Sequence, residues 1–165
     1  ATSLTAKDME FAQDHLRILS GLYGLLRPLD LMQPYRLEMG TKFPVGSSAN
    51  LYDFWGKKIT DRLNDALSSH SDPAVINLAS NEYASVIKPS ALDGPMITPV
   101  FKEEKDGKSR VIGLFAKRAR GMMARYMIKK RLKTSNALKK FNDGGYQFQP
   151  EQSDEKTWVF SRPQP

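Results

Sequence analysis

The amino-acid sequence predicts an α+β (mixed α/β) fold, with a mixed, partly antiparallel sheet covered by helices. Helical periodicity alternates along the chain with short apolar runs of strand length. The pair Asp106-Gly107 separates two extended runs, which is a strong signal for an antiparallel hairpin. Because helices and strands are intermixed and a hairpin is present, a covered mixed sheet is favoured over a doubly wound parallel sheet.

The N-terminal region predicts one helix followed by a turn and a strand. Apolar residues at spacings of three and four predict a helix over residues 6–20, with Thr5 and Asp8 in capping-box positions. Gly21 should end this helix, so that Gly21-Leu22-Tyr23-Gly24 forms a structured turn behind it. Residues 35–40 alternate weakly between polar and apolar side chains and predict a strand.

The central region predicts a second helix, a buried strand and a hairpin. Asn50 and Asp53 can start a second helix, whose apolar positions from Leu51 to Leu67 follow the helical repeat and which should end near Ser69-His70. The β-branched run at residues 74–78 is typical of a buried strand. Residues 96–103 and 109–115 should form the two antiparallel strands of the hairpin.

A basic helix is predicted over residues 116–132, and one or two late strands are predicted near residues 147–149 and 158–160. One stripe of this helix should face the core: Phe115, Ala119, Met122, Met123 and Tyr126. Cations flank the stripe on both sides, with Lys117, Arg120 and Arg131 on one shoulder and Arg118, Arg125 and Lys129 on the other.

Length and composition predict a single globular domain over residues 1–165. Cysteine is absent, which excludes disulfides, thiolate metal sites and cysteine nucleophiles. The apolar runs are far shorter than the roughly 20 residues of a membrane span, so no membrane partner is expected. Residues 1–7 lack the apolar core of a signal peptide.

Positive charge is concentrated in one stretch, residues 107–142, here called the basic segment. This segment holds 12 Lys/Arg and no Asp/Glu, whereas the rest of the chain holds 13 basic and 18 acidic residues. The net charge of +7 therefore comes entirely from the basic segment. A concentrated positive field attracts polyanions, so nucleic acid is the leading candidate partner.

Several stretches in order along the chain resemble the YaaA family of bacterial peroxide-stress proteins. The longest runs from Leu16-Arg17-Ile18-Leu19-Ser20-Gly21-Leu22-Tyr23-Gly24 through Arg27-Pro28-Leu29-Asp30 to Gln33-Pro34-Tyr35-Arg36-Leu37-Glu38-Met39-Gly40. Further matches are Leu51-Tyr52-Asp53-Phe54-Trp55-Gly56, Ile76-Asn77-Leu78-Ala79-Ser80-Asn81-Glu82-Tyr83, Pro99-Val100-Phe101 and Ala116-Lys117-Arg118-Ala119-Arg120-Gly121. The resemblance covers nearly the whole chain.

This resemblance implies a cytoplasmic protein that limits oxidative damage, lowers free iron under peroxide stress and binds DNA through a positively charged cleft. Family members also carry an N-terminal region, including a Ser-Pro-Ala-Lys segment, that has no counterpart in these 165 residues. The chain is therefore expected to be a fragment that corresponds to the C-terminal two-thirds of the family chain. Its oligomeric state stays open.

The predicted DNA contacts are to the backbone of double-stranded or damaged DNA. The candidate nucleic-acid-binding residues are Arg36, Lys117, Arg118, Arg120, Arg125 and Lys129. Peptide N–H groups of the turn Gly21, Leu22, Tyr23 and Gly24 could hold a phosphate, in loose similarity to a helix-hairpin-helix turn. A solvated helix face and a plain helix C-cap are the structural alternatives.

A dispersed polar group supports the alternative of a nucleotide- or nucleic-acid-processing enzyme of glycosylase or lyase type. Its members are Tyr35, Arg36, Glu38, Asn77, Ser80, Glu82, Tyr83, Lys88 and Lys117. Glu38 or Glu82 could act as general base, and Lys117 as an electrostatic stabiliser or Schiff-base amine. A structural salt-bridge network is the favoured interpretation of the same residues.

No metal site and no cofactor are predicted. His15 and His70 are the two histidines and lie on different predicted elements. Glu103, Glu104 and Asp106 are interpreted as solvated charge in an exposed turn. Tyr52 and Trp55 could stack on bases, but their helical spacing favours core packing.

Overall fold

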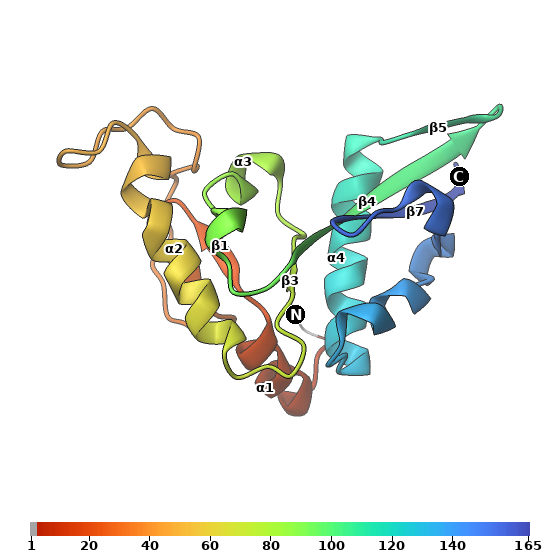
Figure 1. Ribbon diagram of the computed structural model, residues 1–165, viewed down its shortest axis with the longest axis horizontal. Helices are drawn as coiled ribbons and strands as arrows, with labels where there is room; N and C mark the ends of the chain where they lie inside the picture. Colours follow the sequence, from red (N-terminus) through yellow and green to blue (C-terminus); the bar gives the residue numbers. More distant parts are fainter. Residues whose placement is uncertain (1–2) are drawn as a thin grey trace. The chain divides into compact units, whose positions relative to one another are not determined.

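The computed structural model describes residues 3–165 and confirms the α+β fold with a mixed sheet (Figure 1). The chain divides into two compact units. The first unit contains the described residues through Ser69 and Ala79–Gly94, and the second contains His70–Leu78 and Pro95–Pro165. Each unit is described by itself below.

The first unit opens with helix α1, Ala6–His15, and the hairpin of strands β1, Ile18–Ser20, and β2, Gly24–Leu26. The predicted capping box is present at the start of α1. The prediction of a helix through residue 20 is wrong beyond His15. Residues 18–20 follow the helical repeat, but their backbone pairs antiparallel with β2 instead, and a hairpin satisfies the same peptide groups.

The turn Gly21–Gly24 therefore follows a strand, and its predicted place behind a helix is wrong. The turn links β1 to β2, and Gly24 takes a positive φ of 74°. A Cβ on Gly24 would lie 2.7 Å from the Trp55 ring, and one on Gly21 would lie 2.4 Å from the Leu37 carbonyl oxygen. Both glycines are required by close packing.

The strand predicted over residues 35–40 is also wrong, because this stretch pairs with no strand. Its side chains and ends are fixed by other contacts. The Gly40 N–H donates to Glu82 Oε1 at 2.8 Å, and the Tyr35 hydroxyl shares a hydrogen bond with Ser20 Oγ. Met39 is completely buried, so the segment is held by packing and side-chain contacts.

Helix α2, Leu51–Leu67, confirms the predicted second helix, with the Asn50 side chain accepting from the Asp53 N–H as N-cap. Gly56 interrupts it with non-helical dihedral angles. A short helix α3, Asn81–Ala84, and a 3₁₀ turn η1, Pro89–Ala91, complete the first unit.

The second unit contains a five-stranded sheet with the path β3-β4-β7-β6, while β5 pairs with β4. Its strands are β3 Val75–Ile76, β4 Met96–Lys105, β5 Lys108–Arg110, β6 Gln147–Phe148 and β7 Thr157–Pro163. The pairs β3–β4 and β4–β7 are parallel, while β4–β5 and β6–β7 are antiparallel. Asp106 and Gly107 have φ of 51° and 69° in the turn of the predicted hairpin.

The second strand of that hairpin is shorter than predicted, because helix α4 begins early. The predicted strand 109–115 ends at Arg110, and α4 spans Gly113–Lys130, so the helix predicted from residue 116 starts three residues sooner. Arg131 closes it in the left-handed region. The 3₁₀ turns η2 Ser135–Lys140, η3 Asp143–Gly145 and η4 Pro150–Gln152 lie between α4 and β7.

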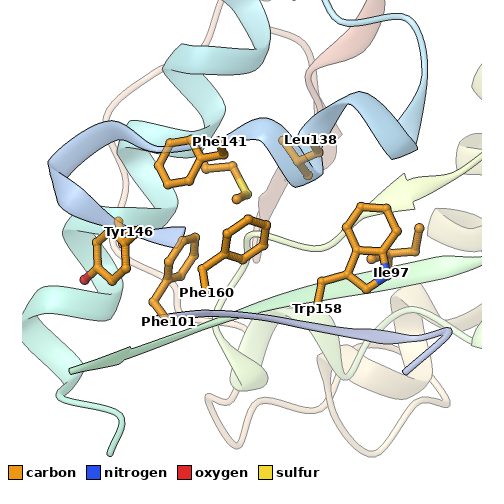
Figure 2. Packing of buried hydrophobic residues seen from close by; sticks show 9 residues of the cluster. Ile97, Phe101, Leu138, Phe141, Tyr146, Trp158 and Phe160 are labelled. Atoms are coloured by element: carbon orange, nitrogen blue, oxygen red, sulfur yellow. The ribbon is translucent and has the colours of Figure 1, made fainter. Parts of the chain in front are cut away.

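The core of the second unit is an aromatic cluster enclosed by α4, the sheet and the segment after α4 (Figure 2). Phe101 from β4 stacks at 5.7 Å on Phe160 from β7, and Tyr146 packs edge-on against Phe101 at 5.1 Å. Ala119 and Met123 of α4 are completely buried in the same cluster. This contact determines which face of α4 points to solvent.

Candidate nucleic-acid interface

Helix α4 presents exposed cations because its apolar stripe is fixed in the core. Arg118, Arg125 and Lys129 are all exposed. They are seven and four residues apart, so they recur on one side of the helix over a rise of about 16 Å. The direction in which they point is set by the burial of Ala119 and Met123.

The other shoulder of α4 carries Lys117 and Arg120, which differ in exposure. Lys117 is exposed, whereas Arg120 is half-buried and its Nη1 lies 3.4 Å from the Leu78 carbonyl oxygen. One N–H group of the Arg120 guanidinium therefore contacts the backbone just after strand β3. Within residues 3–165, neither Lys117 nor Arg118 makes an ion pair.

Charge is divided unequally between the two units. The second unit has 16 Lys/Arg and 8 Asp/Glu, while the first has 9 Lys/Arg and 10 Asp/Glu. Of the 12 cations of the basic segment, all but Arg120 are exposed. The second unit is thus strongly basic and the first is nearly neutral.

The turn Gly21–Gly24 in the first unit is tightly held. The Gly21 carbonyl oxygen accepts from Trp55 Nε1 at 2.9 Å, and the Tyr23 N–H donates to Ser20 Oγ at 2.9 Å. The Tyr23 N–H is therefore used inside the unit rather than offered to a phosphate. Trp55 is half-buried with its ring against Gly24, and the Tyr52 hydroxyl donates to the Glu82 carbonyl oxygen at 3.0 Å.

Part of the dispersed polar group comes together in the first unit. The Tyr83 hydroxyl donates to Glu38 Oε2 at 2.5 Å, and Glu82 Oε1 accepts from the Gly40 N–H. Glu38 and Glu82 are both exposed at the surface of the unit. The two candidate carboxylates therefore hold segments 38–40 and 82–83 together.

The other members of the polar group are placed elsewhere. Ser80 caps α3 by accepting from the Tyr83 N–H, and Arg36 and Lys88 are exposed in the first unit. Asn77 is buried in the second unit, where its Nδ2 donates to Thr98 Oγ1 at 3.2 Å. Lys117 also belongs to the second unit.

Burial raises the pKa of Tyr83 to about 12, with further contributions from the hydrogen bond to Glu38 and from the negative charge of that carboxylate. Both the hydrogen bond and the charge favour the protonated phenol. Tyr83 is therefore a neutral hydrogen-bond donor at physiological pH.

The interpretation of Glu103 as solvated charge is wrong. Its side chain is fully buried, pairs with Arg162 at 2.8 Å and accepts a hydrogen bond from the Tyr146 hydroxyl. Burial and the bond to Glu103 raise the pKa of Tyr146. The sequence carried a signal for this, because strand alternation places Glu103 on the same face as Ile97 and Phe101.

Within the part of the chain that the structure describes, no group of three or more His, Cys, Asp or Glu side chains is arranged to hold a metal ion. His15 stacks on Phe11 with ring centroids 3.8 Å apart and contacts its carbonyl oxygen through Nδ1. No helix among the described residues is both long and apolar enough to cross a membrane.

Comparison with known proteins identifies the family of this chain. The family model described as peroxide stress protein YaaA matches residues 1–152. UPF0246 proteins are 56% identical over 165 residues in Caulobacter vibrioides, 58% over 164 in Saccharophagus degradans and 57% over 162 in Magnetococcus marinus. These alignments cover 100%, 99% and 98% of this chain, which spans 65%, 64% and 63% of the respective relatives. The chain therefore belongs to the peroxide stress protein YaaA family.

Proposed function

We propose that this chain supplies a DNA-binding surface of a peroxide-stress protein, with helix α4 lying against the phosphate backbone. The observation that carries the proposal is the row of exposed cations on α4, above all Arg118 and Arg125, whose direction is fixed by the buried stripe. No Asp or Glu occurs anywhere in the basic segment, so the segment as a whole is strongly positive.

Arginine suits this role because its planar guanidinium can donate two hydrogen bonds to one phosphate. Side chains anchored on a helix lose less freedom on binding than those on a mobile loop. Cations of this kind bind the backbone without reading base edges, so the proposed binding is insensitive to sequence. Each neutralised phosphate releases counterions, which makes the affinity fall steeply with salt.

Titration of a fluorescent DNA duplex by anisotropy, repeated across salt concentrations, tests this proposal. Replacing both Arg118 and Arg125 with Gln should weaken binding about a hundredfold, since each charge-assisted contact is worth about tenfold. The slope of log K against log salt should also fall by about two.

A double variant on helix α2 is the matched control. Lys57 and Arg62 are exposed helical cations of the nearly neutral first unit, paired with Asp61 and Asp65. Replacing both with Gln removes the same charge and should leave affinity nearly unchanged. If the α2 and α4 double variants lose affinity equally, or neither does, helix α4 is not the binding surface.

The proposal includes a role in limiting iron-mediated damage, which the protein would perform by covering the DNA that it binds. A protein lying along the backbone restricts access of iron and peroxide to the strand it covers. The α4 double variant should then also lose the protection of duplex DNA against cleavage by Fe²⁺ and hydrogen peroxide, while the α2 control keeps it.

A further inference from the structure

We propose that the DNA backbone makes its closest approach to the protein at Gly121, in the middle of helix α4. There the bare helix backbone is surrounded by three cations and can seat a phosphodiester group. The inference rests on the proposed DNA-binding function, and it specifies where and how the backbone lies on α4.

Glycine at position 121 lowers the stability of helix α4. It lies inside the 18-residue helix Gly113–Lys130, where glycine is less stable than alanine because it has more backbone freedom to lose. A Cβ built on Gly121 meets nothing within 4 Å, and the residue is exposed. Gly21, Gly24 and Gly40 differ, since a Cβ on each would collide with neighbouring atoms. Packing within the described residues therefore gives no reason for glycine at this position.

The neighbours of Gly121 on the helix surface are the residues three and four positions away. They are Lys117 and Arg118 one turn before, and Ala124 and Arg125 one turn after. Three of the four are cations, and these three are exposed. On a helical wheel Gly121 falls between Lys117 and Arg125, about 40° from each.

A side chain at Gly121 would stand in the middle of this ring and hold a bound group away from the helix. Coulomb attraction falls with distance, so a phosphate that can rest on the bare backbone interacts more strongly with all three cations. Close approach of a ligand to the backbone is a common reason for glycine. A phosphodiester group that rests on the side of the helix at Gly121 can therefore be reached by all three cations.

A membrane surface with phosphate headgroups would present similar chemistry, but α4 does not suit it. Interfacial helices bury a broad apolar face in the lipid. The apolar stripe of α4 is buried in the aromatic cluster of its own unit, through Ala119 and Met123. Anionic phospholipid vesicles are therefore the negative control, and no binding to them is expected.

The test combines thermal unfolding with duplex titration for Gly121→Ala and Gly121→Leu. Gly121→Ala should raise Tm by about 2–4 °C through the gain in helix stability, yet weaken duplex binding a few-fold. Gly121→Leu should weaken it about tenfold and lower the salt slope by about one, as expected for the loss of one phosphate contact. Gly113→Ala is the matched control, since a Cβ there also meets nothing within 4 Å, and its affinity should not change.

The outcomes separate this inference from the function it rests on. If Gly121→Leu binds duplex as the wild type does while Arg118→Gln with Arg125→Gln does not, the backbone contacts α4 elsewhere and only this inference fails. If neither variant loses affinity, the proposed function fails as well. A fall in Tm for Gly121→Ala would show an internal packing role for the glycine and would also overturn the inference, as would equal losses for Gly113→Ala.

Discussion

At the residue scale, Tyr83 shows how the neighbourhood of one side chain defines its chemistry. Its hydroxyl donates to Glu38, and the adjacent Glu82 accepts from the Gly40 N–H. Two carboxylates on neighbouring segments could serve as acid and base in another setting. Here each carboxylate already accepts a hydrogen bond from a donor of the same unit, which favours a structural role for both over a catalytic one.

The pKa of Tyr83 gives a testable pH dependence. A folded-state pKa of about 12 lies above the ordinary value of 10.0, so the protonated phenol is favoured by folding. The associated stability is fully present below pH 10 and is lost as the pH rises from about 10 to 12. We expect ultraviolet absorbance titration of Tyr83→Phe, subtracted from wild type, to reveal one phenol ionising near pH 12.

Glu38→Gln provides the companion measurement, since it removes the carboxylate charge but retains a side chain that can accept a hydrogen bond. The Tyr83 pKa should then move down toward its ordinary value, with the remaining elevation due to burial, the largest cause. A Tyr83 that titrates near pH 10 in the wild type would contradict the described contact.

The sequence predicted which cations of α4 share one side of the helix, but it did not predict which side chains form hydrogen bonds across the fold. The helical repeat alone places Arg118, Arg125 and Lys129 on one shoulder of α4, and the structure agrees because they are exposed while the adjacent stripe is buried. It could not find the pairing of Glu38 with Tyr83, which lie 45 residues apart. Contacts of this separation depend on the tertiary fold, to which local spacing carries no signal.

At the element scale, a helix, strand or turn could be predicted where its local sequence disfavours every other backbone conformation. Helix α2 has both an Asn50 cap and a long apolar repeat, and the Asp106-Gly107 turn has few competing conformations. Residues 18–20 satisfied the helical repeat yet form strand β1, because pairing with β2 and contacts of Ser20 outweigh a weak helical preference. Residues 35–40 had the alternation of a strand but no partner strand.

Strands β4 and β7 are joined by the buried pair of Glu103 and Arg162, which also involves the turn η3. Arg162 Nη1 donates to the Gly144 carbonyl oxygen at 2.8 Å, and its guanidinium lies 4.4 Å from the Tyr146 ring centroid. The pair therefore connects two parallel strands to the segment that follows α4. Removing either partner leaves the other charge poorly compensated.

A double-mutant cycle of urea unfolding measures this connection. Glu103→Met alone and Arg162→Met alone should each destabilise the protein by about 3–5 kcal/mol. The variant with both substitutions should be more stable than the sum predicts, with a coupling energy of about 2–3 kcal/mol, because no buried charge remains. Effects that add to within about 0.5 kcal/mol would show that the two side chains do not depend on each other.

At the scale of the whole molecule, charge and fold divide the chain in the same way. The basic segment lies entirely within the second unit, and the first unit carries nearly balanced charge. Sequence composition revealed the basic segment but carried no signal for the boundaries of the two compact units. The second unit gathers His70–Leu78 from the middle of the chain, a pairing of distant segments that composition does not encode.

This division predicts unequal protection of lysines when DNA binds. Lys117 and Lys129 are exposed on α4, while Lys7 and Lys88 are exposed in the first unit. Acetylation with a water-soluble reagent, followed by mass spectrometry, should show that saturating duplex slows modification of Lys117 and Lys129 several-fold. The first-unit lysines should react at unchanged rates, because only the basic unit is expected to lie against the phosphate backbone. Uniform slowing of all four lysines would instead mean that DNA surrounds the protein without a preferred face, and Arg118→Gln with Arg125→Gln should then leave the pattern unaltered.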